Sequence, residues 1–427
     1  MTPWLFVDLT TTLEEVGRHP HGTTRVERGI VACLARSAPP DVRFVAWQRA
    51  AGRFVEIPAA EAARLATAPA VPDRWRASRP AWLDHPLVVP LRALRRRLLA
   101  LARRPRRVPV PAPAPAATAD PFTPGGVLLI PAEANRQDYA ALVRLKREKG
   151  LHLVFVFFDL LQVLEDDDPR LADPGASDLP PTDFMVREGA LLLAISEFSR
   201  GELQRHLRRR GLAGPPVVTL RLAGEVPQGV ARAVPGLQPG RFVLSVGDVV
   251  ARKNHALLLR VWRAWAQAAR LPEAVLPLVI AGRIDAEGRP LVADAMADPV
   301  LRDLVRFLPN ADDEALAWLY RQCRFTVFPS LLEGFGLPVA ESLAAGKACL
   351  ASTASSIPEA GQGAAIGLDP TDAQAWLDAV RRLAGDDAAL AAEEARLAGA
   401  YRMVSWEDTV ADIRAAIAAW RAAEQRP

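Results

Sequence analysis

Short apolar runs alternate with amphipathic helical patterns along most of the 427-residue chain. The second half shows this order most clearly, and its apolar runs cover residues 241–247, 275–282, 304–308, 324–330 and 348–352. Comparable runs in the first half cover residues 4–10, 42–47, 126–131, 153–159 and 191–196. Apolar strands that are each followed by a helix are typical of a parallel sheet covered on both faces. The pattern therefore predicts an α/β protein built on doubly wound parallel sheets.

The domain organisation follows from length and from one proline-glycine cluster. A chain of this length usually divides its core between two domains, and the cluster at 233–240 lies between the two sheet-forming halves. We expect an N-terminal domain over 1–235, a C-terminal domain over 236–404, and a final helix within 405–427 that packs back on the first domain. The regular pattern is interrupted at 58–124, which predicts an irregular Arg/Pro-rich excursion.

Two helix starts can be read from capping patterns. Ser199 and Glu202 have the spacing of a capping box and predict a helix start there. The sequence SWED at Ser405 predicts the start of the last helix, which Trp406 and Trp420 would anchor.

Composition and charge favour an ordinary globular protein of the cytoplasm. The net charge is +4, and about a quarter of the residues are charged. The scattered cysteines Cys33, Cys323 and Cys349 lack disulfide or metal-site spacing, so we expect buried thiols in a reducing compartment. The opening residues predict a strand rather than a signal peptide. The most apolar stretch, 151–164, is interrupted by Asp159 and is too short to span a bilayer.

One segment has an uneven charge. Residues 91–107 hold eight arginines interleaved with leucines and no acidic residue. A solvated helix or linker and a peripheral contact with an anionic membrane, on its inner face, both fit this composition. Nucleic acid is the weakest partner, because the segment lacks interleaved aromatic residues and no nucleic-acid-binding motif accompanies it.

The stretch SLLEGFGLPVAESLAAG places Glu333 and Glu341 on either side of a glycine-proline corner. It follows a predicted strand, where doubly wound sheets bind ligands. Gly334 and Gly336 allow a tight turn and a close approach to a ligand. Pro338 suits the first position of a helix, whose free N–H groups bind anions such as a diphosphate.

A carboxylate accepts hydrogen bonds from sugar hydroxyls. The corner therefore fits a nucleotide-diphosphate sugar, with Glu341 on the ribose and Glu333 on the transferred sugar. In the alternative interpretation the corner is a structural turn, with Glu341 favouring the helix dipole and Glu333 solvated.

Here the second half resembles a known family. FPSLLEGFGLPVAESLAAGKACLAS is similar to the signature of the retaining GT-B glycosyltransferases of family four, whose two glutamates are separated by seven residues. LSVGDVVARKNHALLL resembles that family's phosphate-binding loop, with Arg252 and Lys253 at its basic pair; alone, the pair would fit a solvated helix start. The resemblance implies two facing Rossmann-like domains with a cleft between them, retention of configuration, and catalytic roles for Glu333, Arg252 and Lys253. It implies the following donor-binding residues: Gly22, Gly334, Phe335, Gly336, Leu337, Pro338 and Glu341.

The first half resembles the family more loosely. HPHGTTRVERGI is similar to the glycine-containing loop of polysaccharide-building members, with Gly22 and Arg25 in a Gly-x-x-Arg-Val pattern; a plain turn glycine is the alternative for Gly22. VFFDLLQV resembles the family's His-Asp segment, but Phe158 stands in place of the histidine. The resemblance implies that Asp159 and Arg25 contact the acceptor or the sugar; a plain strand-end carboxylate is the alternative for Asp159.

No metal or other cofactor is expected. LEDDDP at 164–169 has the Asp-x-Asp spacing by which a different glycosyltransferase fold holds a divalent metal. A solvated loop is the preferred interpretation. The family that the second half resembles neutralises the leaving diphosphate with basic side chains and a helix terminus rather than with a metal. The six histidines form no recognisable ligand cluster.

These features predict a metal-independent retaining hexosyltransferase. It would move a hexose from a nucleotide-diphosphate sugar, with a lean toward GDP-mannose or a related GDP-sugar, to a growing polysaccharide or lipid-linked glycan. The alternative is a catalytically silent nucleotide-sugar-binding scaffold in a glycan assembly complex, which Phe158 favours and the intact charged residues oppose. A nicotinamide-dependent dehydrogenase would need a Gly-x-Gly-x-x-Gly turn after a strand, and neither half has one.

Overall fold

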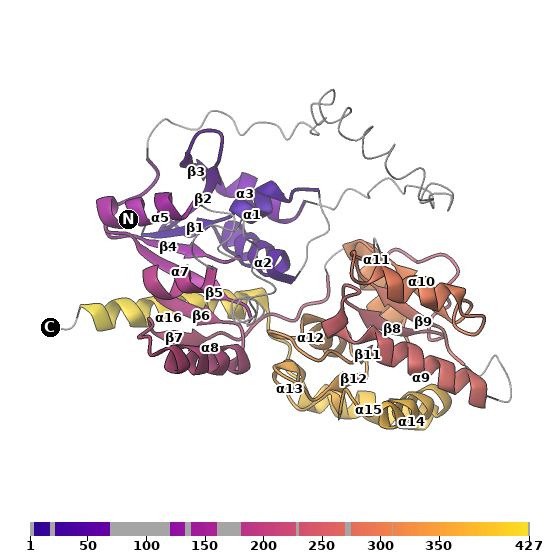
Figure 1. The fold of residues 1–427 in the computed structure, drawn as a ribbon. Coiled ribbons are helices and arrows are strands. Elements are labelled where there is room, and N and C mark those ends of the chain that lie inside the picture. Colours follow the sequence, from indigo (N-terminus) through magenta and orange to yellow (C-terminus); the bar gives the residue numbers. More distant parts are fainter. Residues whose placement is uncertain are drawn as a thin grey trace, which may run out of the picture.

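The chain forms two α/β domains, each a sheet with helices on both faces (Figure 1). The structure is a computed structural model that describes residues 4–17, 22–68, 120–132, 138–159, 181–227, 230–269, 275–309 and 311–425. The expected α/β class and doubly wound arrangement are confirmed. The arginine-leucine segment 91–107 and the acidic segment 164–169 lie outside the described residues.

The first sheet has seven strands in the order β3-β2-β1-β4-β5-β6-β7. Their bounds are β1 (Leu5–Asp8), β2 (Val42–Gln48), β3 (Arg53–Ile57), β4 (Val127–Ile130), β5 (His152–Phe157), β6 (Gly189–Ala194) and β7 (Val217–Thr219). All neighbours are parallel except β3, which is antiparallel to β2. The sequence pattern did not predict β3, because its alternating exposed residues lack the continuous apolar character of the buried parallel strands.

Two helical layers cover the first sheet. On one face lie α1 (Thr10–Glu14), α2 (Gly22–Ser37), α3 (Ala59–Ala66) and α16 (Trp406–Glu424). On the other face lie α5 (Tyr139–Lys149), α7 (Pro181–Glu188) and α8 (Glu197–Arg210). Each layer shares a separate cluster of buried apolar side chains with its face of the sheet, because successive strand residues point to opposite faces.

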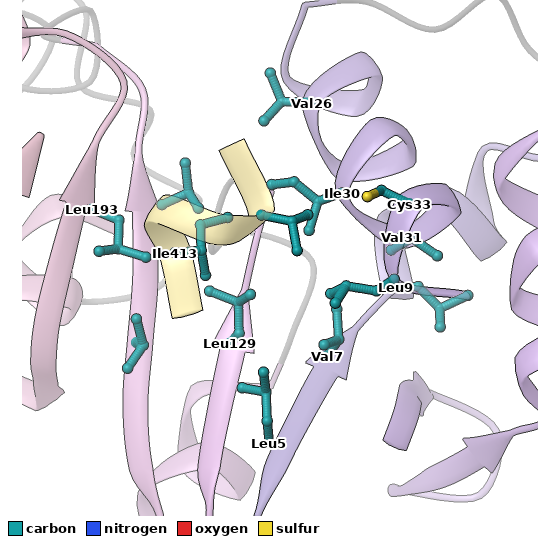
Figure 2. Close-up of a cluster of buried hydrophobic side chains, with 14 of the residues drawn as sticks. Leu5, Val7, Leu9, Val26, Ile30, Val31, Cys33, Leu129, Leu193 and Ile413 are labelled. Atoms are coloured by element: carbon teal, nitrogen blue, oxygen red, sulfur yellow. The ribbon is translucent and has the colours of Figure 1, made fainter. Parts of the chain in front are cut away.

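The final helix belongs to the core of the first domain. The yellow ribbon of α16 lies along this domain (Figure 1). In the sequence, however, α16 is far from the other elements of the domain. In Figure 2, Ile413 of α16 and Ile30 of α2 lie over the strands that carry Leu129 and Leu193. The predicted cap at Ser405 is confirmed as a capping box with Asp408.

The second sheet has six parallel strands in the order β10-β9-β8-β11-β12-β13. Their bounds are β8 (Val243–Val246), β9 (Leu278–Ala281), β10 (Val305–Leu308), β11 (Thr326–Phe328), β12 (Cys349–Ser352) and β13 (Ile366–Leu368). The helices are α9 (His255–Ala268), α10 (Arg289–Ala297), α11 (Asp313–Gln322), α12 (Leu337–Ala344), α13 (Ile357–Gly361), α14 (Ala373–Gly385) and α15 (Asp387–Ala400), with a 3-10 turn η2 at Ala251–Lys253. The strand order reverses between β8 and β11, which is the topological switch point of such a sheet.

The chain passes between the domains twice, and the two passages touch. Leu222 packs in the first domain's core, whereas Val226 packs on the second. The chain therefore leaves the first domain between Leu222 and Val226, before the 235/236 boundary expected from the proline-glycine cluster. The returning segment lies beside it, since the Gly224 N–H donates to Val404 O at 3.1 Å.

Two local expectations are corrected. Residues 59–66 fall inside the expected irregular excursion but form α3, because Pro58 precedes a run of good helix formers rather than interrupting one. The α8 helix is capped by Ser196, whose side chain accepts from the Ser199 N–H, so the predicted Ser199–Glu202 capping box is wrong. Ser199 instead lies inside the first turn.

The three cysteines are free and buried, as the sequence predicted. In the part of the chain that the structure describes, every helix is too short or too polar to cross a membrane.

The packing of α16 on α2 yields the first testable prediction. A Cβ added at Gly29 in α2 would lie 2.2 Å from the Trp406 ring. We expect Gly29→Ala to lower the free energy of unfolding by about 1–3 kcal/mol through overpacking, as measured by denaturant unfolding. The control is Gly399→Ala in α15, where an added Cβ meets nothing within 4 Å and alanine should stabilise the helix slightly. Equal effects of the two changes would contradict this packing.

Candidate functional site

The switch point of the second sheet gathers three of the predicted catalytic residues. Arg252 and Lys253 lie in η2, after β8, while Glu333 lies in the loop after β11. Because β8 and β11 are neighbours, their following loops meet at the same edge of the sheet. The Lys253 Nζ lies 2.7 Å and an Arg252 guanidinium nitrogen 3.0 Å from the same oxygen, Glu333 Oε1.

Backbone hydrogen bonds hold the two loops together. The Leu331 N–H donates to Arg252 O at 2.8 Å, and the Arg252 side chain donates to Leu332 O at 3.2 Å. Asn254, whose φ of 56° places it in the left-handed region, donates from Nδ2 to Pro329 O at 3.2 Å. The position of the basic pair therefore depends on backbone contacts as well as on charge.

Two of the three charged groups of this cluster are shielded from water, whereas the Arg252 side chain is 33% exposed. Glu333 and Lys253 are each 8% exposed. Burial alone would raise the pKa of Glu333, but Lys253 and Arg252 outweigh it and hold that pKa below its ordinary value. Burial, then the positive charge of Lys253, lowers the pKa of the neighbouring His255 to about 4. Glu333 is thus ionised and His255 neutral at physiological pH, so the site holds two cations and one anion.

Both carboxylate oxygens of the second glutamate of the corner have partners, one from each domain. Glu341 lies in α12 and is 1% exposed. Tyr320 of α11 donates to its Oε2 at 2.6 Å, and Arg25 of α2 forms an ion pair with its Oε1. Burial and then the Glu341 charge raise the pKa of Tyr320 well above its ordinary value, so its hydroxyl stays a donor. Burial opposes the charge on Arg25, yet Glu341 leaves the pKa of Arg25 above its ordinary value.

Gly334 is required by the contact between the domains. A Cβ there would lie 2.4 Å from Phe158 O and 2.8 Å from Asp159 Cβ, at the end of β5. The Gly334 carbonyl accepts from Ser196 Oγ at 2.6 Å and from Ser199 Oγ at 3.1 Å. The close approach that this glycine allows in the structure is therefore to the other domain.

Further contacts fix the corner in place. Ser355 Oγ accepts from the Glu333 N–H at 2.9 Å, and Ser356 Oγ donates to Glu333 O at 2.8 Å. Glu359 of α13 reaches across to the first domain and accepts from the N–H groups of Glu197 and Phe198, each at 2.7 Å. It thereby satisfies free N–H groups at the start of α8.

The remaining corner residues shape the turn. Gly336 has a φ of 109° and forms the predicted tight turn. Pro338 is the second helical residue of α12 rather than the first. The N–H groups of Val339 and Ala340 both donate to Gly336 O. Because these two N–H groups are already engaged, the start of α12 has fewer free donors for an anion than the sequence predicted.

Phe335 and Leu337 are partly buried against the core of the first domain. Gly22 is the first residue of α2 and is exposed, and an added Cβ there would meet nothing within 4 Å. The predicted role of Gly22 in approaching a donor stays a prediction.

The switch point of the first sheet lies between β1 and β4 and carries a buried polar cluster. Asp8 and Glu27 are each 1% exposed. The Thr10 N–H donates to Asp8 Oδ1 at 2.9 Å, and the Thr12 N–H donates to Glu27 Oε1. Burial, and next the Asp8 carboxylate, raises the pKa of Glu27 to about 8. Glu27 therefore keeps its proton at neutral pH.

In the described residues, no group of three or more His, Cys, Asp or Glu side chains has the arrangement of a metal site. Asp166 and Asp168, which carry the Asp-x-Asp spacing, lie outside them.

Sequence reasoning missed several residues of this site. Tyr320 falls on the buried face of a predicted amphipathic helix, where an apolar role is the default. Ser355 and Ser356 lie in the segment SSIPEAG, which the sequence analysis did not assign to the site. Glu359 in the same segment gives no local sign of its contact with α8.

Comparison with known families matches residues 231–398 to the family described as glycosyl transferases group 1. The chain is 29% identical to O-antigen chain mannosyltransferase B of Escherichia coli over 51% of this chain and 58% of that protein. It is 32% identical to D-inositol 3-phosphate glycosyltransferase of Thermobispora bispora over 46% of this chain and 47% of that protein. The chain thus spans about half the length of these curated relatives.

Solved structures resemble nearly the whole chain. Anabaena HepE in complex with UDP-glucose has a TM-score of 0.58 at 13% identity, covering 98% of this chain and 100% of that one. Sucrose-phosphate synthase from Thermosynechococcus elongatus has a TM-score of 0.58 at 15% identity, covering 99% and 100%. At such identities the likeness concerns the fold. The chain has the GT-B fold, with two Rossmann-like α/β domains, as the sequence predicted.

The ion pair between the domains yields the second testable prediction. Arg25→Met leaves the buried Glu341 without its cation, so we expect it to lower the free energy of unfolding by about 3–5 kcal/mol, as measured by denaturant unfolding. The control is Arg36→Met on the same helix, where the pair with Glu407 is 61% and 63% exposed and should contribute less than about 1 kcal/mol.

Adding Glu341→Gln to Arg25→Met should recover much of the loss, because the uncompensated charge is then gone. Equal destabilisation by Arg25→Met and Arg36→Met would show that the pair does not hold the domains together.

Proposed function

We propose that this protein is a glycosyltransferase of polysaccharide or O-antigen-type biosynthesis that uses a nucleotide-diphosphate sugar as donor. The observation that carries the proposal is the convergence of Arg252, Lys253 and Glu333 at the switch point of a sheet. Ligands of doubly wound sheets bind at such points. The residues also lie within the stretch that matches glycosyl transferases group 1.

Arg252 and Lys253 would stabilise the leaving diphosphate. Negative charge grows on the diphosphate as its bond to the sugar breaks, and fixed cations in a site shielded from water stabilise that charge strongly. In the structure both cations face Glu333, which keeps them in place. We propose that the diphosphate then shares these cations, so that Glu333 becomes available to the sugar.

Glu341 would bind the ribose of the donor. Both of its oxygens are already engaged, by Tyr320 and Arg25. A ribose hydroxyl must therefore share Oε1 with Arg25 or displace it. This competition couples donor binding to the contact between the domains.

The finer chemistry is also proposed. Retention of configuration fits a site in which the leaving diphosphate deprotonates the acceptor on the same face of the sugar, so that no protein nucleophile is needed. A GDP-linked hexose such as GDP-mannose is the proposed donor, and the mannosyltransferase among the relatives supports it. UDP-sugars are tested as well, because a solved structure with a similar fold is a complex with UDP-glucose. The proposed acceptor is a growing polysaccharide or lipid-linked glycan.

We propose that the reaction needs no metal, because the basic pair supplies the charge. A cytoplasmic location fits the three buried free thiols. A silent scaffold is not favoured, since it has no evident need for a basic pair held on a buried carboxylate.

Separate changes of the two glutamates form the third testable prediction. Glu341→Gln should weaken nucleoside diphosphate binding by about 1–3 kcal/mol, the value of a hydrogen bond to a charged group. Glu333→Gln should lower turnover by about 10²-fold without weakening nucleotide binding, because it removes an anion that competes for Arg252 and Lys253. Calorimetry with GDP and UDP, and transfer from GDP-mannose and UDP-glucose with and without chelator, measure these effects.

Unchanged binding and turnover in both variants would reduce the corner to a structural turn and contradict the proposed function. Activity that is lost in chelator and restored by manganese would contradict the metal-independent mechanism alone.

A further inference from the structure

The two helical layers of the first domain differ in charge. The layer of α5, α7 and α8 carries ten basic and five acidic side chains, a net +5. The opposite layer of α1, α2, α3 and α16 carries six basic and seven acidic side chains, a net charge near zero because Glu27 keeps its proton. Within the helical layers of the first domain, the excess positive charge therefore lies on one face, in addition to the eight arginines of 91–107 that lie outside the described residues.

Most acidic side chains of this layer form ion pairs with basic side chains of the same layer. The pairs are Lys146–Glu188, Arg200–Glu197, Arg205–Glu202 and Arg210–Asp183, and Lys149 pairs with Asp120. Five arginines remain exposed, and among the described residues none of them has a carboxylate within ion-pair distance. They are Arg144, Arg147, Arg187, Arg208 and Arg209, and we call them the basic face.

A groove of about 620 Å³ runs between α5 and α7 on this face. Three arginines and two glutamates line it: Arg144, Arg147, Arg187, Glu148 and Glu188. The stacked rings of Tyr139 and Phe184, with centroids 4.0 Å apart, lie at the same groove. Anionic groups would therefore meet three guanidinium groups and two carboxylates, one of which, Glu188, is paired with Lys146.

The far end of α8 adds an apolar element. Leu212 follows Arg208 and Arg209 closely and is 43% exposed. Arginines beside an exposed leucine suit the headgroup region of a bilayer, where charge and apolar groups are both accommodated.

The basic face also lies away from the corner. The first residues of α8 contact Glu359 and Gly334, whereas Arg208 and Arg209 lie at the other end of this 14-residue helix, about 20 Å away at 1.5 Å per residue. Arg187 lies in the last turn of its helix and Arg147 near the end of its own, just before the next strand begins. A surface bound here would leave the corner accessible.

We propose that the basic face docks the protein on an anionic lipid bilayer. Each arginine near an anionic membrane surface contributes about 1 kcal/mol, so five act together to hold the protein there. Single-stranded nucleic acid is a poorer fit, because its binding sites expose aromatic rings for base stacking, and Phe184 is buried. The proposal concerns a surface separate from the corner and does not depend on the proposed function.

The test compares two full-length variants of equal net charge, and it is the fourth testable prediction. The first changes the five arginines of the basic face to glutamine. The control changes five exposed arginines elsewhere, Arg36, Arg49, Arg64, Arg263 and Arg302, to glutamine. A third variant changes the eight arginines of 91–107 to glutamine, because that segment was expected to bind membranes as well.

Sedimentation uses vesicles of phosphatidylglycerol with phosphatidylcholine, and phosphatidylcholine alone. The basic-face variant should lose about 100-fold or more in partitioning to anionic vesicles, while the control keeps most of it. Binding of the unaltered protein should weaken as salt rises. Circular dichroism and nucleoside diphosphate binding should be unchanged, which separates this result from a failure of folding or of the donor site.

Four results would overturn the proposal. One is equal loss of binding in the basic-face and control variants. Another is loss only in the 91–107 variant. The third is equal binding to neutral and anionic vesicles. The fourth is tighter binding to single-stranded RNA, measured in parallel, than to anionic vesicles.

Discussion

Two buried carboxylates organise the corner of this protein, and one of them links its two halves. A buried carboxylate destabilises a fold unless cations and donors compensate its charge. Glu333 takes its cations from its own domain, through Lys253 and Arg252. Glu341 takes Arg25 from the other domain. One charge therefore organises a site within the second domain, and the other ties that site to the first domain.

The strand order explains why these groups meet. The loops after β8 and β11 are brought together because the two strands are neighbours where the order reverses. Gly334 then lets the second loop approach the end of β5, where a side chain would collide with Phe158 O. The corner thus combines charge from one sheet with backbone contact to another, and a ligand bound there would affect both.

The sequence predicted what is local and repeated. Apolar runs located most of the parallel strands, and the spacing of Glu333 and Glu341 located the corner. It did not predict contacts between distant segments: the Tyr320 hydroxyl on Glu341, the Glu359 carboxylate on the start of α8, or the pairing of Arg25 with Glu341. Such contacts join residues far apart in the chain, and no periodicity or local propensity encodes them. The antiparallel β3 was missed because it lacks the continuous apolar run of the buried parallel strands. The helix α3 was missed because it lies inside the interval 58–124, which was expected to be irregular.

The central claim is that the positive charge at the switch point binds the diphosphate of a nucleotide sugar. Its most direct test is the melting temperature of the unaltered protein in rising concentrations of GDP, UDP, the matching monophosphates and the nucleosides. Binding to the folded state raises the melting temperature by mass action. The account predicts a concentration-dependent rise with one nucleoside diphosphate, a smaller rise with its monophosphate, and none with its nucleoside. No rise with either diphosphate, or equal rises with diphosphate and nucleoside, would contradict it.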